Sequence, residues 1–428
     1  MRQVMWHELS SSAQQQVLQR SATVADVAVS QAVAAIISRV RNEGDRALFD
    51  YTWQFDGAKL ESLEVSVAEY AATSSLTRVE QHAILTAQAN IHDYHQRSSP
   101  QPFEYQRDGL TLGKLLRPID RVGLYIPGGS APLVSTLLML AIPAAVAGCP
   151  TKVLVTPPRR DGSIAPAILF AAQACGIERV YKVGGAQAIA ALALGTESLP
   201  RVHKIFGPGN KYVTAAKLQV AQIPGGAALD MPAGPSEVCV IAAAVANPIF
   251  VASDLLAQAE HDVAAQVILV TTSSHLASAV QVEVQRQLGY LSRRAIIEQA
   301  LSHSTIIVAT DLEQCFAIAN DYAPEHLILH LENAADYLAQ VTNAGSVFLG
   351  PWTPEAVGDY ASGSNHVLPT YGYAKMYSGL DVSAFMKTIS YQQLSRSGLA
   401  HLAPTVATLA DLEGLDAHKN ALMVRLEF

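Results

Sequence analysis

The stretch that decides the fold is RVGLYIPGGSAPLVSTLLMLAIPAAVAGCPTKVLVT, residues 121–156. It begins with a short apolar run at Val122–Ile126, passes through a turn rich in glycine and proline, and continues as an apolar segment at Leu133–Ala147. A second short run follows at Lys152–Thr156. Short apolar runs bounded by turn residues indicate buried strands, and the longer segment between them indicates a helix. This order predicts a parallel, doubly wound α/β sheet.

The same alternation extends over most of the chain. Further strands are predicted at Arg179–Val183 and His203–Phe206, with helices at Ile164–Ala174, Ala186–Leu194 and Lys211–Val220. After Ser236 a second alternation begins, with strands expected at Val238–Ala242, Gln266–Thr271, Thr305–Val308 and near Leu327–Leu329 and Ser346–Leu349. Two α/β domains are the simplest account. Residues 26–120, and the end of the chain from about Val382, have helical patterns instead.

The composition of the 428 residues excludes several classes of protein. Half of the residues are hydrophobic and 15% are charged, against about 25% in an average soluble protein, which excludes a disordered chain. The net charge of −8 argues against nucleic acid or an anionic membrane as a partner, so a small-molecule substrate remains. The low charged fraction also predicts that another subunit covers part of the surface.

Neither a secretory signal nor a membrane span is expected. The first ten residues lack an apolar signal-peptide core, and the longest apolar run, Leu133–Cys149, is interrupted by Pro143. That run is also shorter than the roughly 20 residues that a membrane-spanning helix needs. The four cysteines form no CxxC pair and are interpreted as reduced thiols of the core. These features predict a cytoplasmic protein.

Five turns between the predicted elements are rich in glycine and proline. They are Pro127–Pro132, Gly184–Gln187, Gly207–Asn210, Met231–Ser236 and Gly350–Pro354. In an open α/β sheet ligands bind in the turns at the carboxyl ends of the strands, and glycine lets backbone amides approach a phosphate. An ordinary tight turn explains any one of them, but the five together favour a dinucleotide-sized ligand. The sequence has no GxGxxG and no Walker motif, so a standard Rossmann fingerprint is absent.

Several polar motifs suggest metal binding or acid–base chemistry. Gln258 and His261 are three residues apart, so a helix places them on one face, where they can bind a metal. A capped helix end explains the same pair. Glu325 and His326 follow a proline, and a carboxylate beside an imidazole suits acid–base catalysis near neutral pH. A polar turn before a strand explains that pair equally well.

Carboxylates and imidazoles also meet in Gly358–His366 and in Glu413–Asn420. The sequence contains no HExxH, which excludes a zincin protease, and no GxSxG nucleophile elbow. Spacing alone therefore leaves the metal hypothesis open.

Taken in order, these segments resemble the histidinol dehydrogenase family, which catalyses the last two steps of histidine biosynthesis. The motifs that carry the resemblance are GLYIPGGSAPL at 123–133, VGGAQAIA at 183–190, IFGPGN at 205–210, DMPAGPSE at 230–237, DLLAQAEH at 254–261, APEHL at 323–327 and GSNH at 363–366. The resemblance covers nearly the whole chain and is strongest from Arg121 to His366. Several motifs in the same order are far more specific than any one of them.

The resemblance implies a zinc enzyme that oxidises L-histidinol through L-histidinal to L-histidine with two NAD⁺. One zinc per subunit is expected on Gln258, His261, Asp359 and His418. These four residues, with Ser236, His326 and Glu413, are also expected to bind the substrate. NAD⁺ contacts are expected at Tyr125, Gln187 and Asn210. The catalytic residues implied are Glu325, which activates water, His326, which is the base for alcohol oxidation, and His366, which assists.

The resemblance also implies an α/β fold of two incomplete Rossmann-like domains, similar to aldehyde dehydrogenases, with small helical N- and C-terminal dimerisation segments. The expected boundaries are 1–25 for the N-terminal dimerisation segment, 26–120 and 237–381 for the substrate and zinc domain, 121–236 for the NAD domain and 382–428 for the C-terminal tail. In the homodimer that this implies, Glu413 and His418 reach the active site of the other subunit.

Two alternatives from other classes remain open. One is an NAD-dependent alcohol or aldehyde dehydrogenase on the same scaffold whose substrate lacks an imidazole. The other is a non-catalytic zinc- or nucleotide-binding protein, which is disfavoured because Glu325, His326 and His366 are all present. A thiol nucleophile, as in an aldehyde dehydrogenase, is not expected, because no cysteine has a polar or basic setting that would clearly lower its pKa.

Overall fold

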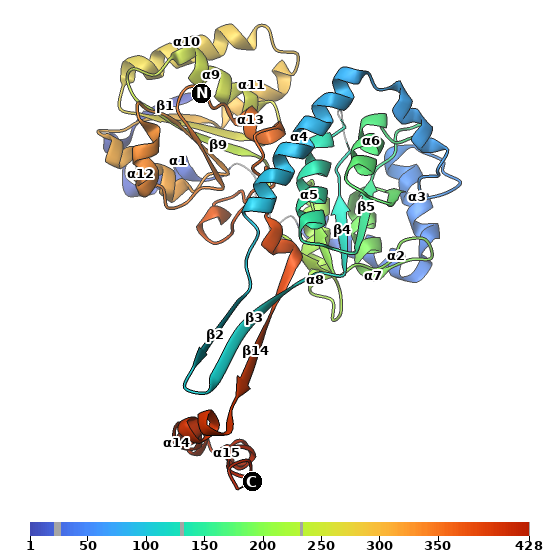
Figure 1. Cartoon of the computed structure of the whole chain (residues 1–428). Helices are drawn as coiled ribbons and strands as arrows, with labels where there is room; N and C mark the ends of the chain where they lie inside the picture. The colour runs from blue at the N-terminus through green and yellow to red at the C-terminus, as the bar shows by residue number, and fades with distance from the viewer. Residues whose placement is uncertain (21–26, 129–131, 232–233, 428) are drawn as a thin grey trace.

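The computed structural model describes residues 1–20, 27–128, 132–231 and 234–427 as two α/β domains and a projecting tail (Figure 1). Parts of the predicted turns at Pro127–Pro132 and Met231–Ser236, and the end of the predicted segment 1–25, lie outside these ranges. All strand pairs within the two large sheets are parallel, which confirms the predicted fold class.

The first domain contains a five-stranded sheet in the order β6-β5-β4-β7-β8. Its strands are β4 (Arg121–Tyr125), β5 (Thr151–Thr156), β6 (Arg179–Lys182), β7 (Lys204–Phe206) and β8 (Ala228–Leu229). One face is covered by α4 (Arg78–Arg97), α5 (Val134–Val146) and α6 (Pro166–Ala174). The other face is covered by α2 (Val27–Glu43), α3 (Asp45–Asp56), α7 (Gly185–Leu194) and α8 (Lys211–Ala221). Three layers therefore enclose two apolar cores, one on each side of the sheet.

The second domain contains a six-stranded sheet in the order β1-β11-β10-β9-β12-β13. Its strands are β1 (Arg2–Met5), β9 (Glu237–Ala242), β10 (Gln266–Thr271), β11 (Thr305–Val308), β12 (His326–His330) and β13 (Ser346–Leu349). Helices α9 (Pro248–Ala259), α10 (Ser274–Leu288) and α11 (Arg294–Ser302) cover one face, and α1 (Ser11–Leu18) and α12 (Leu312–Tyr322) the other. The short helix α13 (Glu355–Tyr360) follows β13.

The two sheets share one topology. Numbered within its own domain, and with β1 set aside, each sheet runs 3-2-1-4-5, which is the order of a Rossmann sheet without its sixth strand. The expectation of two incomplete Rossmann-like domains is therefore confirmed. No helix within the described ranges is long and apolar enough to cross a membrane.

A tail projects from the two domains, as Figure 1 shows. Its arm is an antiparallel sheet in the order β14-β3-β2, made by β2 (Phe103–Arg107), β3 (Leu110–Pro118) and β14 (Met386–Leu394). Its end is formed by α14 (Arg396–Leu412) and α15 (Asp416–Met423). The helical interpretation was wrong for these strands, because most of their residues are half-buried or exposed and no apolar run marks them.

Two expected domain boundaries also need correction. Helices α2, α3 and α4 belong with the sheet of residues 121–236 and not with residues 237–381, because Val33 and Ile37 pack against α7 and α8, and Ile91 packs against α5. Residues 2–18, expected to be a separate dimerisation segment, form edge strand β1 and helix α1 of the second domain, and their expected role in dimerisation stays a prediction. Helical periodicity marks a buried face but does not say which sheet buries it.

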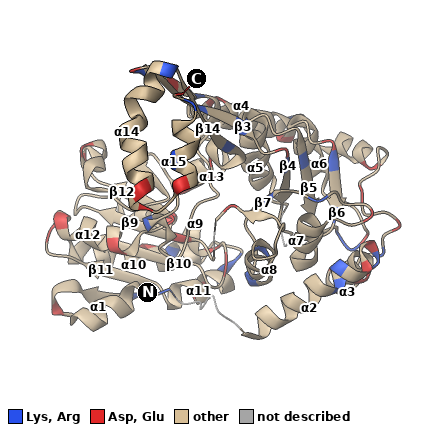
Figure 2. Cartoon of the chain, turned by 90° about the horizontal axis from the view of Figure 1, so that it is seen from below, with Lys and Arg blue, Asp and Glu red and all other residues tan. Residues whose placement is uncertain are grey.

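Charged side chains of both signs are interspersed over the elements (Figure 2), and few of them are buried. One exception supports the turn between β7 and α8. Lys217 pairs with Asp230 and donates to the Gly207 carbonyl at 2.9 Å, while Asp230 accepts the Gly207 N–H at 2.8 Å. Both charged side chains are nearly inaccessible, so each depends on the other for compensation.

We expect Lys217→Met to lower the free energy of unfolding by about 3–5 kcal/mol, because Asp230 would keep a buried charge without its partner. The matched control is Arg294→Met, which breaks the exposed pair with Glu298 and should have a much smaller effect. Urea unfolding of the two variants measures the difference. Equal losses would contradict this assignment of the buried pair.

Candidate active site

The candidate site lies at the amino edge of the six-stranded sheet. His326 is the first residue of β12 and pairs with Val238 of β9, and Glu325 precedes it. Helix α9 leaves the carboxyl end of β9 and returns toward the amino end of β10, so its last turn brings Gln258 to the same edge. Gln258, Glu325 and His326 are all buried, and two motifs far apart in the sequence therefore meet there.

Helix α13 supplies the third wall of this cluster. Asp359 Oδ2 lies 3.8 Å from His261 Nε2, and Asp359 Oδ1 lies 3.7 Å from His326 Nε2. One ligand atom each from His261, Glu355 and Asp359 lies within 4.8 Å of the others, close enough to hold one cation. The structure thus brings together three of the four expected zinc ligands, Gln258, His261 and Asp359.

Glu355 was missed by the sequence analysis. It begins α13 and is 2% exposed, and its Oε1 lies 3.7 Å from His326 Nδ1. The amide orientation of Gln258 that satisfies its neighbours places the Gln258 nitrogen 2.6 Å from Glu355 Oε1 and 3.0 Å from Oε2. One signal was available, because Glu355 precedes Asp359 by four residues and therefore lies on the same helix face.

Glu325 and His326 are held by the same peptide unit. The N–H of Glu237 donates to Glu325 Oε2 at 2.8 Å, and the carbonyl of Glu237 lies 3.2 Å from His326 Nδ1. In the orientation of Gln258 described above, the Gln258 nitrogen also lies 3.1 Å from Nδ1, so Nδ1 has a carbonyl acceptor and an amide donor as neighbours. Burial lowers the pKa of His326 to about 4, and burial raises the pKa of Glu325 well above its usual range.

His366 and Ser236 lie beside this cluster. His366 Nδ1 is 2.8 Å from the Asp359 carbonyl, and its Nε2 is 3.3 Å from Thr136 Oγ1 in the first turn of α5. Burial lowers the pKa of His366. Ser236 directly precedes β9 and is partly buried. The contact with Thr136 joins the cluster to the first domain.

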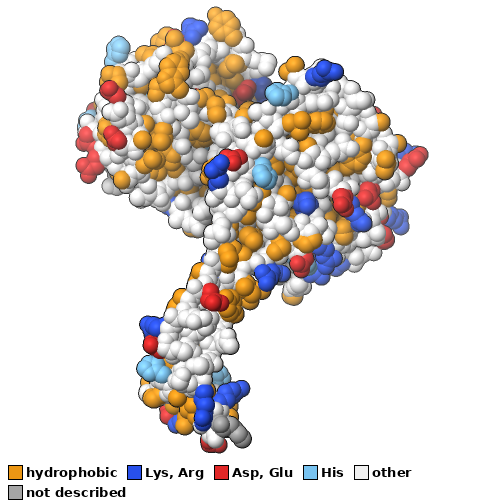
Figure 3. Space-filling view, viewed as in Figure 1, with side chains coloured by type: hydrophobic (Ala, Val, Ile, Leu, Met, Phe, Trp, Pro, Cys, Tyr) orange, Lys and Arg blue, Asp and Glu red, His pale blue; other side chains and the backbone are white. Residues whose placement is uncertain are grey.

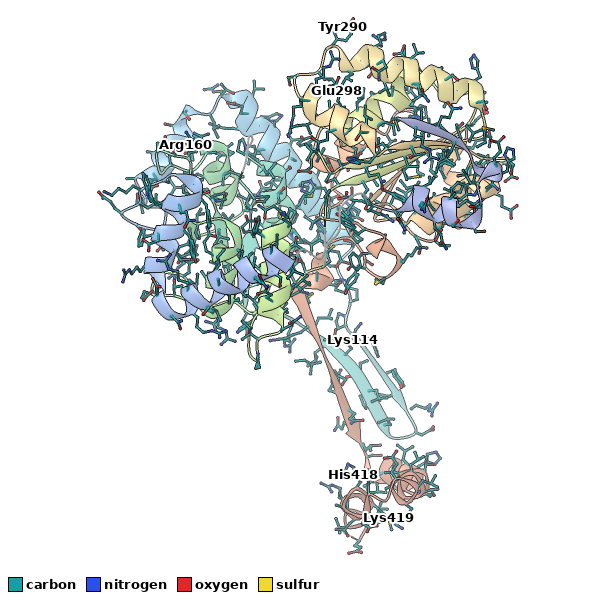
Figure 4. The ribbon with its side chains drawn as sticks, turned by 180° about the vertical axis from the view of Figure 1, so that it is seen from behind. Lys114, Arg160, Tyr290, Glu298, His418 and Lys419 are labelled. Carbon is teal, nitrogen blue, oxygen red and sulfur yellow. The ribbon has the colours of Figure 1, made fainter. Side chains whose placement is uncertain are left out.

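Glu413 and His418 lie elsewhere in the chain. Glu413 caps the end of α14, His418 lies in α15, and both are exposed. Figure 4 places His418 at the end of the tail, far from both domains. A single chain therefore does not bring these two residues to the cluster, and their expected role at the site of another subunit stays a prediction.

A separate cavity of about 920 Å³ lies at the carboxyl edge of the five-stranded sheet. The expected NAD⁺ residues Tyr125, Gln187 and Asn210 all line it. Tyr125 Oη accepts the Gly185 N–H at 3.2 Å, and Asn210 Oδ1 caps α8 by accepting the N–H of Tyr212 at 3.0 Å. The turn after each of β4, β5, β6 and β7 contributes to the lining.

Two buried oxygens of this cavity accept no hydrogen bond from any described residue. They are Gln187 Oε1 and Asp56 Oδ2, the latter on the last residue of α3. Burial raises the pKa of Asp56 to about 6. Because unsatisfied buried acceptors are costly, the cavity suits a ligand that offers hydroxyl or amide donors.

The cavity and the polar cluster lie at opposite kinds of sheet edge. The cavity lies at carboxyl ends of strands, as expected for an open α/β sheet. The polar cluster lies at amino ends instead, where Glu237 and His326 begin their strands. The Thr136–His366 contact links the cluster to the start of α5, in the first domain.

All four cysteines, Cys149, Cys175, Cys239 and Cys315, are free and buried, as expected. Burial raises the pKa of Cys149 to about 11 and those of Cys175 and Cys315 to about 12. Each thiol therefore stays protonated near neutral pH, and none suits a nucleophile.

Comparison with known proteins agrees with this geometry. The family model "Histidinol dehydrogenase" matches residues 18–426. Histidinol dehydrogenase of Vibrio vulnificus (strain YJ016) is 51% identical over all of this chain and 99% of its own length. That of Xanthomonas euvesicatoria is 52% identical over 98% of each chain. The crystal structure of histidinol dehydrogenase from Elizabethkingia anophelis superposes with a TM-score of 0.96 at 45% identity and covers 100% of this chain and 98% of that one.

Proposed function

Since this chain belongs to the histidinol dehydrogenase family, whose members are oxidoreductases acting on histidinol, we propose that it oxidises L-histidinol to L-histidine with one zinc ion per subunit and two NAD⁺. The observation that carries the proposal is the cluster of Gln258, His261, Asp359, Glu325 and His326, which the Thr136–His366 contact joins to the domain that holds a cavity of about 920 Å³. The same assignment favours a cytoplasmic enzyme of amino-acid biosynthesis.

The donors present fit zinc. His261 offers an imidazole, Asp359 a carboxylate and Gln258 an amide oxygen, which together are a mixed nitrogen and oxygen set that suits this ion. His418 of a second subunit would complete the set. When bound, zinc supplies a template that orients the imidazole and amino nitrogens of histidinol.

The chain's own residues account for both proton transfers. His326 is neutral near pH 7, and its imidazole accepts the alcohol proton while hydride leaves for the first NAD⁺. Glu325 takes a proton from water as that water adds to the aldehyde, which gives the anion of a gem-diol; its hydride passes to the second NAD⁺ as the carboxylic acid forms. Burial raises the pKa of Glu325, which makes its carboxylate a stronger base. His366, beside Asp359, assists the second step.

The proposal requires a homodimer. Hydrophobic side chains lie exposed on the tail, including Leu409 and Leu412 of α14 (Figure 3). Trp352, just before α13, and Tyr360, the last residue of α13, are exposed near the cluster. Docking the tail of one subunit against this face of the other would cover both apolar surfaces and bring His418 and Glu413 to the site. The low charged fraction of the chain supports such an interface.

We expect two NADH to form per histidinol consumed, because one site performs both oxidations. A limiting-substrate titration that follows absorbance measures this ratio, and a simple alcohol without an imidazole is the control substrate. Chelation should abolish turnover and Zn²⁺ should restore it. A ratio of one with free histidinal accumulating would contradict the four-electron reaction, and equal turnover of the simple alcohol would favour a different dehydrogenase.

The two bases should separate by step. Glu325→Gln keeps the shape but removes the proton acceptor, so oxidation of histidinal should slow by about 10²–10⁴-fold while alcohol oxidation is less affected. His326→Asn should instead impair alcohol oxidation. Assays of each variant with histidinol and with histidinal measure both half-reactions. Equal damage to both by Glu325→Gln would refute this division.

Mixed dimers test where the fourth ligand comes from. A dimer of one His261→Ala chain and one His418→Ala chain has one intact site if the ligands come from different subunits, and none if they come from the same subunit. Random mixing makes about half of the dimers mixed, so activity should recover to about a quarter of the wild type. Co-expression with two different tags isolates the mixed dimer. If that dimer is inactive, the site is built within one chain.

A further inference from the structure

Glu355 is a buried carboxylate that the proposed reaction does not use. It is 2% exposed, and both of its oxygens lie within 3.0 Å of the Gln258 amide nitrogen. Keeping a carboxyl group this deeply buried is costly. The close contact with an expected metal ligand indicates that Glu355 has a function at this site.

The chemistry of the glutamine side chain supplies that role. An amide can bind a cation through its oxygen but not through its NH₂ group, and the two ends of the group have nearly the same shape. Gln258 could therefore lie in either of two orientations. A carboxylate accepts hydrogen bonds only, so contact with Glu355 stabilises the orientation in which nitrogen faces Glu355 and oxygen is free for the metal. In the reverse orientation two oxygens would face each other at hydrogen-bond distance.

We propose that Glu355 is a positioning residue of the metal centre, which holds the Gln258 amide by its nitrogen so that the Gln258 oxygen binds the ion. This inference rests on the proposed zinc site. Its contacts favour positioning over direct ligation, because both carboxylate oxygens are engaged with Gln258. Mutation of a residue that positions a metal ligand in this way typically weakens metal affinity by about 10–100-fold.

The test compares the zinc affinity of dimeric Glu355→Gln with that of wild type and of Glu260→Gln, by competition with a chromogenic chelator. Glu260→Gln removes one negative charge at the same end of α9, where only the backbone N–H of Glu260 reaches Gln258, through its carbonyl, within the described residues; this variant should bind zinc as wild type does. Glu355→Gln should bind zinc about 10–100-fold more weakly. Its kcat at saturating zinc should recover most of the wild-type value, since no catalytic group is lost.

An exchange variant separates positioning from ligation. In Gln258→Glu/Glu355→Gln either oxygen at position 258 can bind the metal and the amide at position 355 can donate to it, so zinc affinity should exceed that of Glu355→Gln and of Gln258→Glu. In Co²⁺-loaded Glu355→Gln the visible absorption bands should match the wild type, because the ligand set is unchanged. Changed bands would identify Glu355 as a ligand and overturn the inference.

Two further outcomes distinguish this inference from the proposed function. If wild type holds stoichiometric zinc and Glu355→Gln binds it equally tightly, the positioning role is wrong and the zinc site stands. If wild type holds no zinc, the metal site fails, and the inference fails with it.

Discussion

The arrangement of the site depends on one peptide unit, that of Glu237 at the start of β9. The β9–β12 pairing begins one residue later, at Val238 and His326, so the N–H and C=O of Glu237 point toward β12 without a strand to satisfy them. The side chains of Glu325 and His326 satisfy them instead. A backbone requirement for hydrogen bonds therefore fixes the positions of both the carboxylate and the imidazole.

The side chain of Glu237 is itself held by residues from other parts of the chain. Its carboxylate accepts two hydrogen bonds of 2.9 Å from Arg20 and one of 2.7 Å from the Tyr371 N–H. The Arg20 guanidinium also lies 3.8 Å from the centre of the Tyr322 ring. Residues from the N-terminal segment, β9, α12 and the segment after His366 thus converge behind the Glu325–His326 pair. The N-terminal segment, which the sequence suggested for assembly, supports the site within its own chain.

The sequence predicted what depends on local pattern. Strand and helix alternation located both parallel sheets, and the glycine-rich turns located the cavity because they follow the strands that build it. The sequence did not predict which sheet each helix packs against, or that the arm consists of strands. The apolar stripe of α2 could pack equally well against either sheet. Strand β14 is so exposed that its sequence contains no apolar run. Glu355 follows a proline-rich turn, and apart from its four-residue spacing to Asp359 nothing distinguishes it from a surface carboxylate until Gln258 lies against it.

The shape of the tail has a physical consequence for the proposed shared site. His418 lies beyond an arm in which β14 pairs with β3 over nine residues, and β2 pairs with β3 on its other side. A flexible linker of the same length would have to lose its conformational freedom each time the tail docked, which would weaken both the interface and the metal site. The arm is ordered within its own chain before docking. The arm can therefore bring the His418 imidazole to a site on another subunit with little further loss of conformational entropy. In this respect His418 behaves like a ligand that is part of a folded domain.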